Sequence, residues 1–160
     1  MTTSHIISSQ RLHPISNIAS SSLHGTLNAA HSGEGSAGGQ AKLRILLVDD
    51  NEDAVHSLEK LLTLLGYEAR STTSGADALV EGEHFCPDVV LLDLGMPDMD
   101  GFETAAAMRA KPWGGRVRII ALTGWGQQED MRRTQAAGFV AHLVKPLKTY
   151  ELLQLLQKNK

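Results

Sequence analysis

Five short segments of strand character alternate with five segments of helical pattern after residue 41, and this alternation constrains the fold more than any other feature. The strand segments are KLRILLV (42–48), the weaker YEARST (67–72), DVVLLD (88–93), VRIIALT (117–123) and FVAHLV (139–144). Strands that alternate with helices through short connections form βαβ units, whose strands lie parallel. Continuous apolar runs at 45–48 and 89–92 suit strands buried on both faces. We therefore predict an α/β fold with a five-stranded parallel sheet between helices.

Helical patterns separate these segments. The first helix is expected to begin around Asp49, Asp50 and Asn51, whose side chains can accept hydrogen bonds from free N–H groups at a helix start. Gly66 is well placed to end it. One apolar stripe of this helix consists of Val55, Leu58, Leu62 and Leu65. Further helices are predicted over 75–84, 102–110, 127–137 and 148–157.

Residues 1–41 differ in composition from the rest of the chain. They are rich in Ser, Gly, His and Asn, and they end in SGEGSAGGQ, which is typical of a flexible linker. Four histidines occur there, but their spacing matches no compact metal site. A transit peptide would carry several arginines, whereas Arg11 stands alone. We predict a disordered tail or linker over 1–41 and one domain over 42–158.

The charge and the cysteine count exclude several classes of function. The formal net charge is −3 and the basic residues are scattered, so neither nucleic acid nor a membrane is an expected partner. The densest basic pair, Arg132 and Arg133, stands beside Glu129 and Asp130, which indicates a solvated helix face. Cys86 is the single cysteine, so no intramolecular disulfide is possible. No secretory signal or spanning apolar run is present, and we expect a cytoplasmic protein.

Polar side chains occur at the ends of four of the five predicted strands. These residues are Asp49 and Asp50 after the first strand, Asp93 at the end of the third, Thr123 at the end of the fourth and Lys145 after the fifth. The carboxyl ends of parallel strands meet at one edge of a sheet, where ligands bind in open α/β folds. Each residue alone has an ordinary explanation, such as a helix cap or a turn. Together they predict one site.

The chemistry of this set favours phosphoryl transfer. Three neighbouring carboxylates repel one another, so a cation between them is expected, and oxygen ligands suit Mg²⁺. An aspartate beside Mg²⁺ and a lysine is a candidate nucleophile toward phosphorus, giving an aspartyl phosphate. Lys145 can balance further negative charge, and Thr123 can donate a hydrogen bond to a phosphoryl oxygen. Gly124 leaves space for that group to approach.

The chain resembles the receiver domain of two-component response regulators. The resemblance covers about residues 42–158 and rests on LLVDDN, LLDLGMPDMDG, ALTG and LVKP, in the family's order and with about its spacing. It implies the flavodoxin-like, doubly wound (βα)5 fold with strand order 2-1-3-4-5. This order agrees with the alternation of strands and helices.

The resemblance also implies roles for the matched residues. Asp93 matches the phosphoacceptor, Thr123 the switch hydroxyl and Lys145 the lysine that contacts the phosphate. The magnesium ligands that it implies are Asp49, Asp50, Asp93 and the backbone carbonyl of Gly95. The peptide bond between Lys145 and Pro146 is expected to be cis.

One position departs from the family's pattern. The family often has Tyr or Phe three residues before the lysine, as a rotamer switch coupled to the threonine, and here that residue is His142. An imidazole could swing as a ring does and could also titrate. The alternative is a static, half-exposed strand histidine. The coupling of Thr123 to an aromatic side chain therefore stays open.

A receiver would take a phosphoryl group from a histidine kinase or a histidine phosphotransfer protein, and it would not act as an enzyme on other substrates. A downstream protein is expected to dock on the face built by the fourth helix, fifth strand and fifth helix, where phosphorylation can also favour a homodimer. Two forms are open: a stand-alone receiver, which the start at Met1 favours, and a receiver fragment of a hybrid histidine kinase.

Two other classes fit less well. A phosphatase of the haloacid dehalogenase type would need a second acid two residues after Asp93, where the chain has Gly95. A pseudo-receiver that only binds partners usually lacks part of the acidic set, which is complete here.

Overall fold

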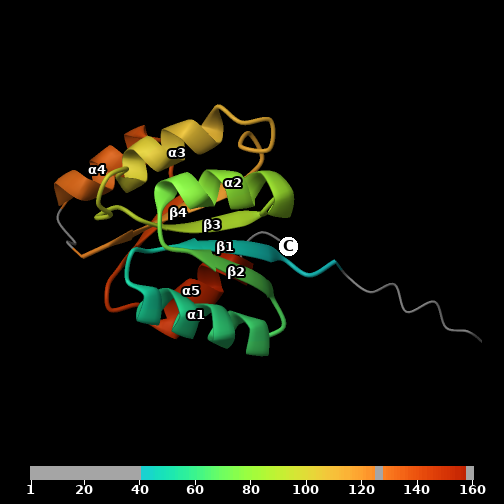
Figure 1. Cartoon of the computed structure of the whole chain (residues 1–160). Helices are drawn as coiled ribbons and strands as arrows, with labels where there is room; N and C mark the ends of the chain where they lie inside the picture. Colours follow the sequence, from blue (N-terminus) through green and yellow to red (C-terminus); the bar gives the residue numbers. More distant parts are fainter. Residues whose placement is uncertain (1–40, 125–127, 158–160) are drawn as a thin grey trace, which may run out of the picture. The chain divides into compact units, whose positions relative to one another are not determined.

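The structure, a computed structural model, describes residues 41–124 and 128–157 (Figure 1). Its strands are β1 (Arg44–Val48), β2 (Glu68–Thr72), β3 (Val89–Asp93), β4 (Arg118–Thr123) and β5 (Ala141–Val144). Its helices are α1 (Glu52–Leu64), α2 (Gly75–Phe85), α3 (Gly101–Arg109), α4 (Gln128–Ala136) and α5 (Thr149–Gln157). The tail predicted for residues 1–41 lies outside the described residues apart from Ala41, so the predicted tail and domain boundary stay predictions.

The five strands form one parallel sheet in the order β2-β1-β3-β4-β5. This confirms the predicted flavodoxin-like α/β class and its strand order. The chain runs outward from β1 to β2, returns to β3 on the other side of β1, and then continues to β4 and β5. The reversal of direction falls between β1 and β3, the position where open α/β sheets form a crevice at their carboxyl edge.

The sheet separates two apolar cores, because successive residues of a strand point to opposite faces. Helices α1 and α5 cover one face, and α2, α3 and α4 cover the other (Figure 1). On the α1 and α5 side the core includes Ile45, Leu47, Val89, Leu91, Val55, Leu62, Leu152 and Leu156. On the α2 and α3 side it includes Leu46, Val48, Val90, Leu92, Ala78, Phe85, Ala105 and Met108. The inner strands are therefore buried on both faces, as their continuous apolar runs predict.

The start and end of α1 refine the sequence prediction. Asn51 is the N-cap, because its side chain accepts a hydrogen bond of 3.0 Å from the backbone N–H of Ala54. This leaves Asp49 and Asp50 before the helix without a capping role. Leu65 does not belong to the buried stripe: it is the C-cap residue and is 46% exposed, since the helix ends at Leu64. Gly66 follows in the left-handed conformation, with φ of 92°.

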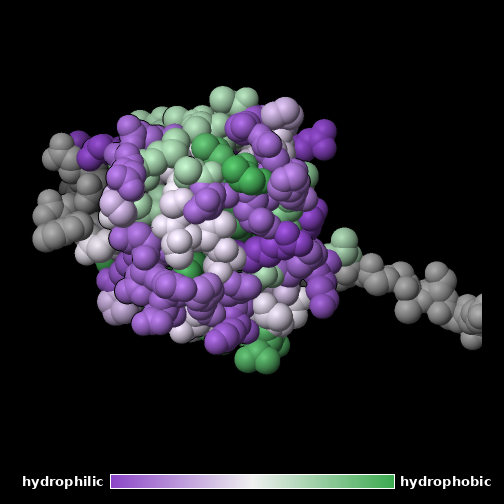
Figure 2. Space-filling model, viewed as in Figure 1, coloured by the Kyte–Doolittle hydropathy of each residue, from purple (hydrophilic) through white to green (hydrophobic). Residues whose placement is uncertain are grey.

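The visible surface over α1 and α2 is mostly hydrophilic (Figure 2). Its hydrophobic colour is confined to small patches. Leu64 at the end of α1 and Val80 on α2 are among the large hydrophobic residues that are exposed. Among the described residues, no helix has the length and apolar character to cross a membrane.

Candidate functional site

The register of the sheet brings the predicted site residues to one edge. Val48 pairs with Leu92, so Asp49 and Asp93 occupy the same level at the ends of β1 and β3. Thr123 pairs with Val144, which places Lys145 one residue beyond Thr123 on the neighbouring strand. The backbone N–H of Lys145 donates a hydrogen bond of 2.8 Å to the carbonyl of Thr123. The parallel topology therefore gathers side chains that are distant in sequence.

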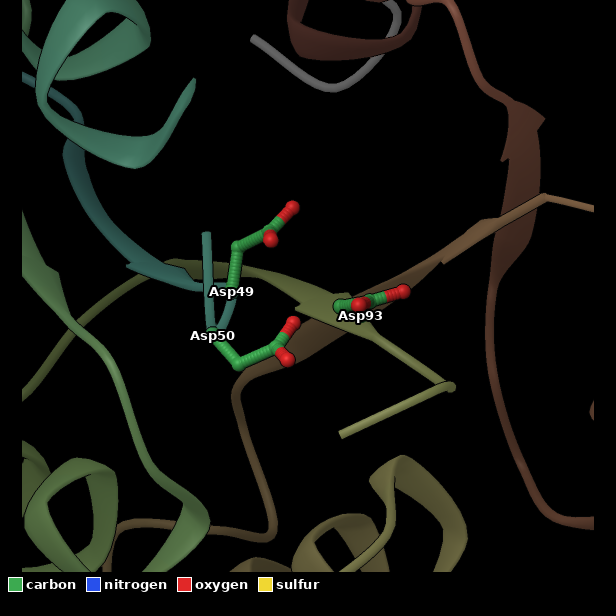
Figure 3. Close-up of side chains that lie close together, drawn as sticks. All are labelled: Asp49, Asp50 and Asp93. Carbon is green, nitrogen blue, oxygen red and sulfur yellow. The ribbon is translucent and has the colours of Figure 1, made fainter. Parts of the chain in front are cut away.

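Three carboxylates converge at this edge (Figure 3). Asp49, Asp50 and Asp93 each offer an oxygen atom, and these atoms lie within 4.8 Å of one another. Asp49 and Asp93 are only 5% and 6% exposed, whereas Asp50 is exposed. Buried carboxylates need compensation by hydrogen bonds or cations. The set contains only hard oxygen donors, which suit a magnesium ion better than a softer metal.

Backbone groups hold the two buried carboxylates. The N–H of Asn51 donates to Oδ1 of Asp49 at 3.0 Å, and the N–H of Gly95 donates to Oδ1 of Asp93 at 3.3 Å. Both bonds span two residues, so they fix each side chain against its own loop. In each aspartate the other carboxylate oxygen is then available to partners from elsewhere in the fold.

The close approach of the loop after β3 depends on Gly101. A Cβ atom at this position would lie 2.4 Å from the carbonyl oxygen of Asp93 and 2.7 Å from Cα of Leu94. Glycine lets the start of α3 fold back onto the end of β3. Asp100 and Glu103 then form a capping box at the helix start. The turn therefore fixes the backbone that carries Asp93 and Gly95.

Lys145 supplies the positive charge of the cluster. Its Nζ lies 2.6 Å from Oδ2 of Asp49 and 3.1 Å from Oδ2 of Asp93. Burial alone would lower the pKa of Lys145. Its hydrogen bonds to Asp49 and Asp93 and the negative charges of these residues together raise the pKa by more than burial lowers it, so the pKa lies above the ordinary 10.5. The lysine is therefore an ammonium ion at neutral pH. The peptide bond from Lys145 to Pro146 is cis.

A hollow of about 440 Å³, here called the Asp93 hollow, opens beside this cluster. It is lined by Asp93, Leu94, Gly95, Asp100, Phe102, Thr123, Gly124, Arg133 and Lys145. Thr123 is buried at its wall. A Cβ atom at Gly124 would meet nothing within 4 Å, so the space beside the threonine is open. The carboxylate, the hydroxyl and the ammonium group thus face one space.

His142 lies outside this space. It pairs in register with Ala121, whereas Thr123 pairs with Val144. Its side chain lines a second hollow of about 600 Å³, here called the His142 hollow, formed by Met131, Arg132, Thr134, Gln135, Phe139, Val140, Ala141 and His142. In this structure the two proposed switch residues therefore line different spaces.

Four residues that line the Asp93 hollow lie outside the predicted set: Leu94, Asp100, Phe102 and Arg133. The sequence predicts a solvated face for Arg132 and Arg133, and both are exposed. The guanidinium carbon of Arg133 nevertheless lies 4.6 Å from the centroid of the Phe102 ring, and both residues line the Asp93 hollow. Their contact depends on how α3 and α4 lie side by side, which no local sequence signal encodes.

Comparison with known families assigns the chain to a family. The family model for the response regulator receiver domain matches residues 45–157. The chain belongs to this family. It is a receiver domain of the kind used in two-component signalling, and the acidic cluster lies where such domains bind Mg²⁺.

Solved receiver structures share the whole described fold. The chemotaxis protein CheY4 of Vibrio cholerae aligns with a TM-score of 0.70 and 32% identity over 73% of this chain and 98% of its own. The receiver domain of a sensor histidine kinase from Pseudomonas aeruginosa aligns with a TM-score of 0.66 and 37% identity, over 73% and 96% of the two chains. That structure has a magnesium ion coordinated in the active-site cleft.

Curated relatives with a similar segment differ in length. An uncharacterized 14.6 kDa protein of Leptolyngbya boryana is 34% identical over 118 residues, which are 74% of this chain and 90% of that protein. Hybrid signal transduction histidine kinase L of Dictyostelium discoideum is 36% identical over 126 residues, which cover 72% of this chain. The match covers only 7% of that kinase, so the kinase's whole activity is not transferred to this chain.

Proposed function

We propose that this receiver is a phosphoacceptor, in which Asp93 takes a phosphoryl group from a phosphohistidine of a histidine kinase or a histidine phosphotransfer protein. The observation that carries the proposal is the cluster around Asp93. One oxygen of its buried carboxylate lies within 4.8 Å of a carboxylate oxygen of Asp49 and of one of Asp50. The carboxylate also lies 3.1 Å from the ammonium group of Lys145. A nucleophilic oxygen, cationic stabilisation and an open space on one rigid sheet edge are the requirements of phosphoryl transfer.

Asp49, Asp50, Asp93 and the carbonyl of Gly95 would hold Mg²⁺, in keeping with their oxygen donors and with the related kinase receiver. When bound, Mg²⁺ would neutralise carboxylate charge and polarise the phosphoryl oxygens. Receiver domains are generally signalling phosphoacceptors, and we propose that this one catalyses only its own phosphorylation and dephosphorylation, in the cytoplasm.

The chain's own groups would carry the transfer step. An oxygen of Asp93 forms the new bond to phosphorus while the phosphorus–nitrogen bond of the donor breaks, and the imidazole nitrogen keeps the electron pair. Lys145 would balance the charge of the incoming group, and the hydroxyl of Thr123 would donate a hydrogen bond to one of its oxygens. The rigid β3 strand keeps Asp93 in place during the step, because Val89–Asp93 is buried throughout.

Phosphorylation would be read on the face formed by α4, β5 and α5. This face carries exposed Met131, Val140, Val144 and Tyr150, together with the His142 hollow. A charge added at Asp93 would draw the Thr123 and Lys145 loops inward and bias this face toward a docking partner or a second copy of the chain. Whether His142 takes part stays a prediction. The same receiver could belong to a hybrid kinase, the kind of protein found among its relatives.

The deciding experiment is labelling by acetyl phosphate with and without Mg²⁺, followed by separation of phosphorylated from free protein. We expect Mg²⁺-dependent labelling of the wild type and none of Asp93→Asn. Asp98→Asn is a matched control: it changes an acid in the same loop, and Asn tolerates the positive φ of 66° found there. Equal labelling of Asp93→Asn would sink the assignment, and steady hydrolysis of a phosphomonoester would favour a phosphatase instead.

A further inference from the structure

Arg133 brings a second cationic side chain to the Asp93 hollow. It comes from α4, whereas the other cation, Lys145, follows β5. Helices α3 and α4 lie on the same face of the sheet (Figure 1), and Arg133 reaches from α4 to Phe102 on α3. The two cations therefore line one space from different elements, with Asp93 at its wall.

An aromatic pair positions the guanidinium group. Its carbon lies 4.6 Å from the ring centroid of Phe102. Phe102 in turn meets the ring of Phe139 edge to face, with centroids 5.8 Å apart and an angle of 79° between the planes. A guanidinium on an aromatic face keeps its in-plane N–H donors available for an anion. Within the described part of the chain, Arg133 forms no salt bridge.

The charge balance of the site suggests a function for a further cationic group. The three carboxylates of the cluster outweigh the ammonium of Lys145, and one divalent ion only balances the remainder. Asp100 adds a further acidic residue to the lining of the hollow. A phosphoryl donor is itself an anion, so it approaches a site with no net attraction. A further cation at the mouth of the hollow would favour the encounter, and a guanidinium matches two phosphoryl oxygens at once.

We propose that Arg133 is an anion-binding residue of the phosphorylation reaction, which captures the phosphoryl group of the donor on its way to Asp93. This inference rests on the proposed phosphoacceptor function. With acetyl phosphate, an oxygen of Asp93 bonds to phosphorus as the bond from phosphorus to the acetyl oxygen breaks, and acetate leaves with that electron pair. Arg133 takes no part in these bonds and acts on the bound anion alone.

A purely structural role for Arg133, in joining α4 to α3, makes different predictions. If Arg133 only joins the two helices, the effect of its loss on labelling does not depend on salt. If Arg133 captures the anionic phosphoryl donor, the effect weakens as salt screens the charges. Lysine keeps the charge but lacks the planar group, so it separates the two roles. The neighbouring Arg132 offers a matched control, because it is exposed on the same helix but lines the His142 hollow.

The test is the initial rate of labelling of the full chain by acetyl phosphate with Mg²⁺, at low and high ionic strength. We expect Arg133→Gln to lower the apparent second-order rate constant roughly three- to tenfold at low salt. The deficit shrinks at high salt, and Arg133→Lys recovers most of the rate. The rate constant of Arg132→Gln stays within about 1.5-fold of the wild type, since this variant loses only a positive charge outside the Asp93 hollow.

A second variant covers the case in which Arg133→Gln disturbs the fold, as thermal unfolding would show. Phe102→Leu keeps an apolar side chain beside α4 and removes the aromatic face, and we expect it to slow labelling although Arg133 is present. The inference is wrong if Arg133→Gln labels at the wild-type rate, if Arg132→Gln loses as much, or if the deficit is independent of salt and lysine does not reduce it. An unlabelled wild type, or equal labelling of Asp93→Asn, would instead overturn the phosphoacceptor function and this inference with it.

Discussion

Lys145 forms a salt bridge of 2.6 Å with Asp49, although β3 and β4 lie between the strands that carry them. The lysine reaches back across the carboxyl edge of the sheet and contacts Asp93 on the way, at 3.1 Å. Its ammonium group thus compensates two carboxylates that are almost completely buried. The same carboxylates are the proposed ligands of Mg²⁺, so the lysine and the metal compensate the same negative charge.

Removal of the positive charge of Lys145 should destabilise the metal-free protein and strengthen metal binding. We expect Lys145→Met to lower the free energy of unfolding by about 1–3 kcal/mol in EDTA, because two buried carboxylates lose a charged partner. Added Mg²⁺ should then raise the melting temperature more than it does in the wild type, since it binds a more negative site. Urea and thermal unfolding with and without Mg²⁺ measure both effects.

Lys148→Met is the matched control. Lys148 is exposed and pairs with Glu151 three residues along, so its loss should change stability by less than about 0.5 kcal/mol.

The sign of the pH dependence follows from the raised pKa of Lys145. The stabilisation that Lys145 contributes is fully present below pH 10.5, and it is lost as the pH rises through the raised pKa of the folded protein. An equal response of Lys145→Met and wild type to Mg²⁺ would contradict the shared role.

Asp50 should contribute to metal binding rather than to folding, because it is exposed and does not cap α1. We expect Asp50→Asn to weaken Mg²⁺ binding by about tenfold or more, as expected for the loss of a charged ligand, and to leave metal-free stability nearly unchanged. Titration calorimetry gives the affinity. Asp53→Asn, an exposed acid in the first turn of α1, should bind Mg²⁺ as the wild type does. A similar loss in both variants would show a general charge effect.

His142 and Thr123 line different hollows, and this predicts different effects on the chemistry. Thr123→Ala removes a hydroxyl beside Asp93, and we expect it to slow labelling by acetyl phosphate roughly tenfold or more. His142→Ala should change the rate by less than about twofold, since its ring lines the hollow between α4 and β5. If His142→Ala slows labelling as strongly as Thr123→Ala does, the two side chains are coupled in spite of their separation.

The strands and helices followed from local patterns, and their bounds differ from the prediction by one or two residues. The site edge followed as well, because parallel topology places the ends of all strands together, and Asp49, Asp93, Thr123 and Lys145 end or follow strands. Gly66 ends α1 as predicted, but Leu65 of the predicted apolar stripe is the C-cap residue and is 46% exposed, because apolar periodicity does not show how far the last residue of a helix is buried.

Contacts between distant elements could not be predicted from the sequence. Arg133 and Phe102 belong to different helices, and their approach depends on the packing of α3 and α4 against the sheet. The same holds for the 2.6 Å bridge from Lys145 to Asp49, which needs the reach of a lysine across two strands. The sequence identifies the groups at the edge, but side-chain packing decides which of them meet.

The loop between α3 and β4 offers a test of packing away from the site. A Cβ atom at Gly114 would lie 1.7 Å from the carbonyl oxygen of Met108, which is backbone and has little freedom to move. Arg109 also fixes this loop, with hydrogen bonds of 2.7 Å and 2.6 Å to the carbonyls of Gly114 and Val117. We therefore expect Gly114→Ala to destabilise the fold by about 1–3 kcal/mol in urea unfolding. Gly115→Ala, with nothing within 4 Å of its added carbon, should stay within about 0.5 kcal/mol of the wild type, and equal stability of both variants would refute the steric argument.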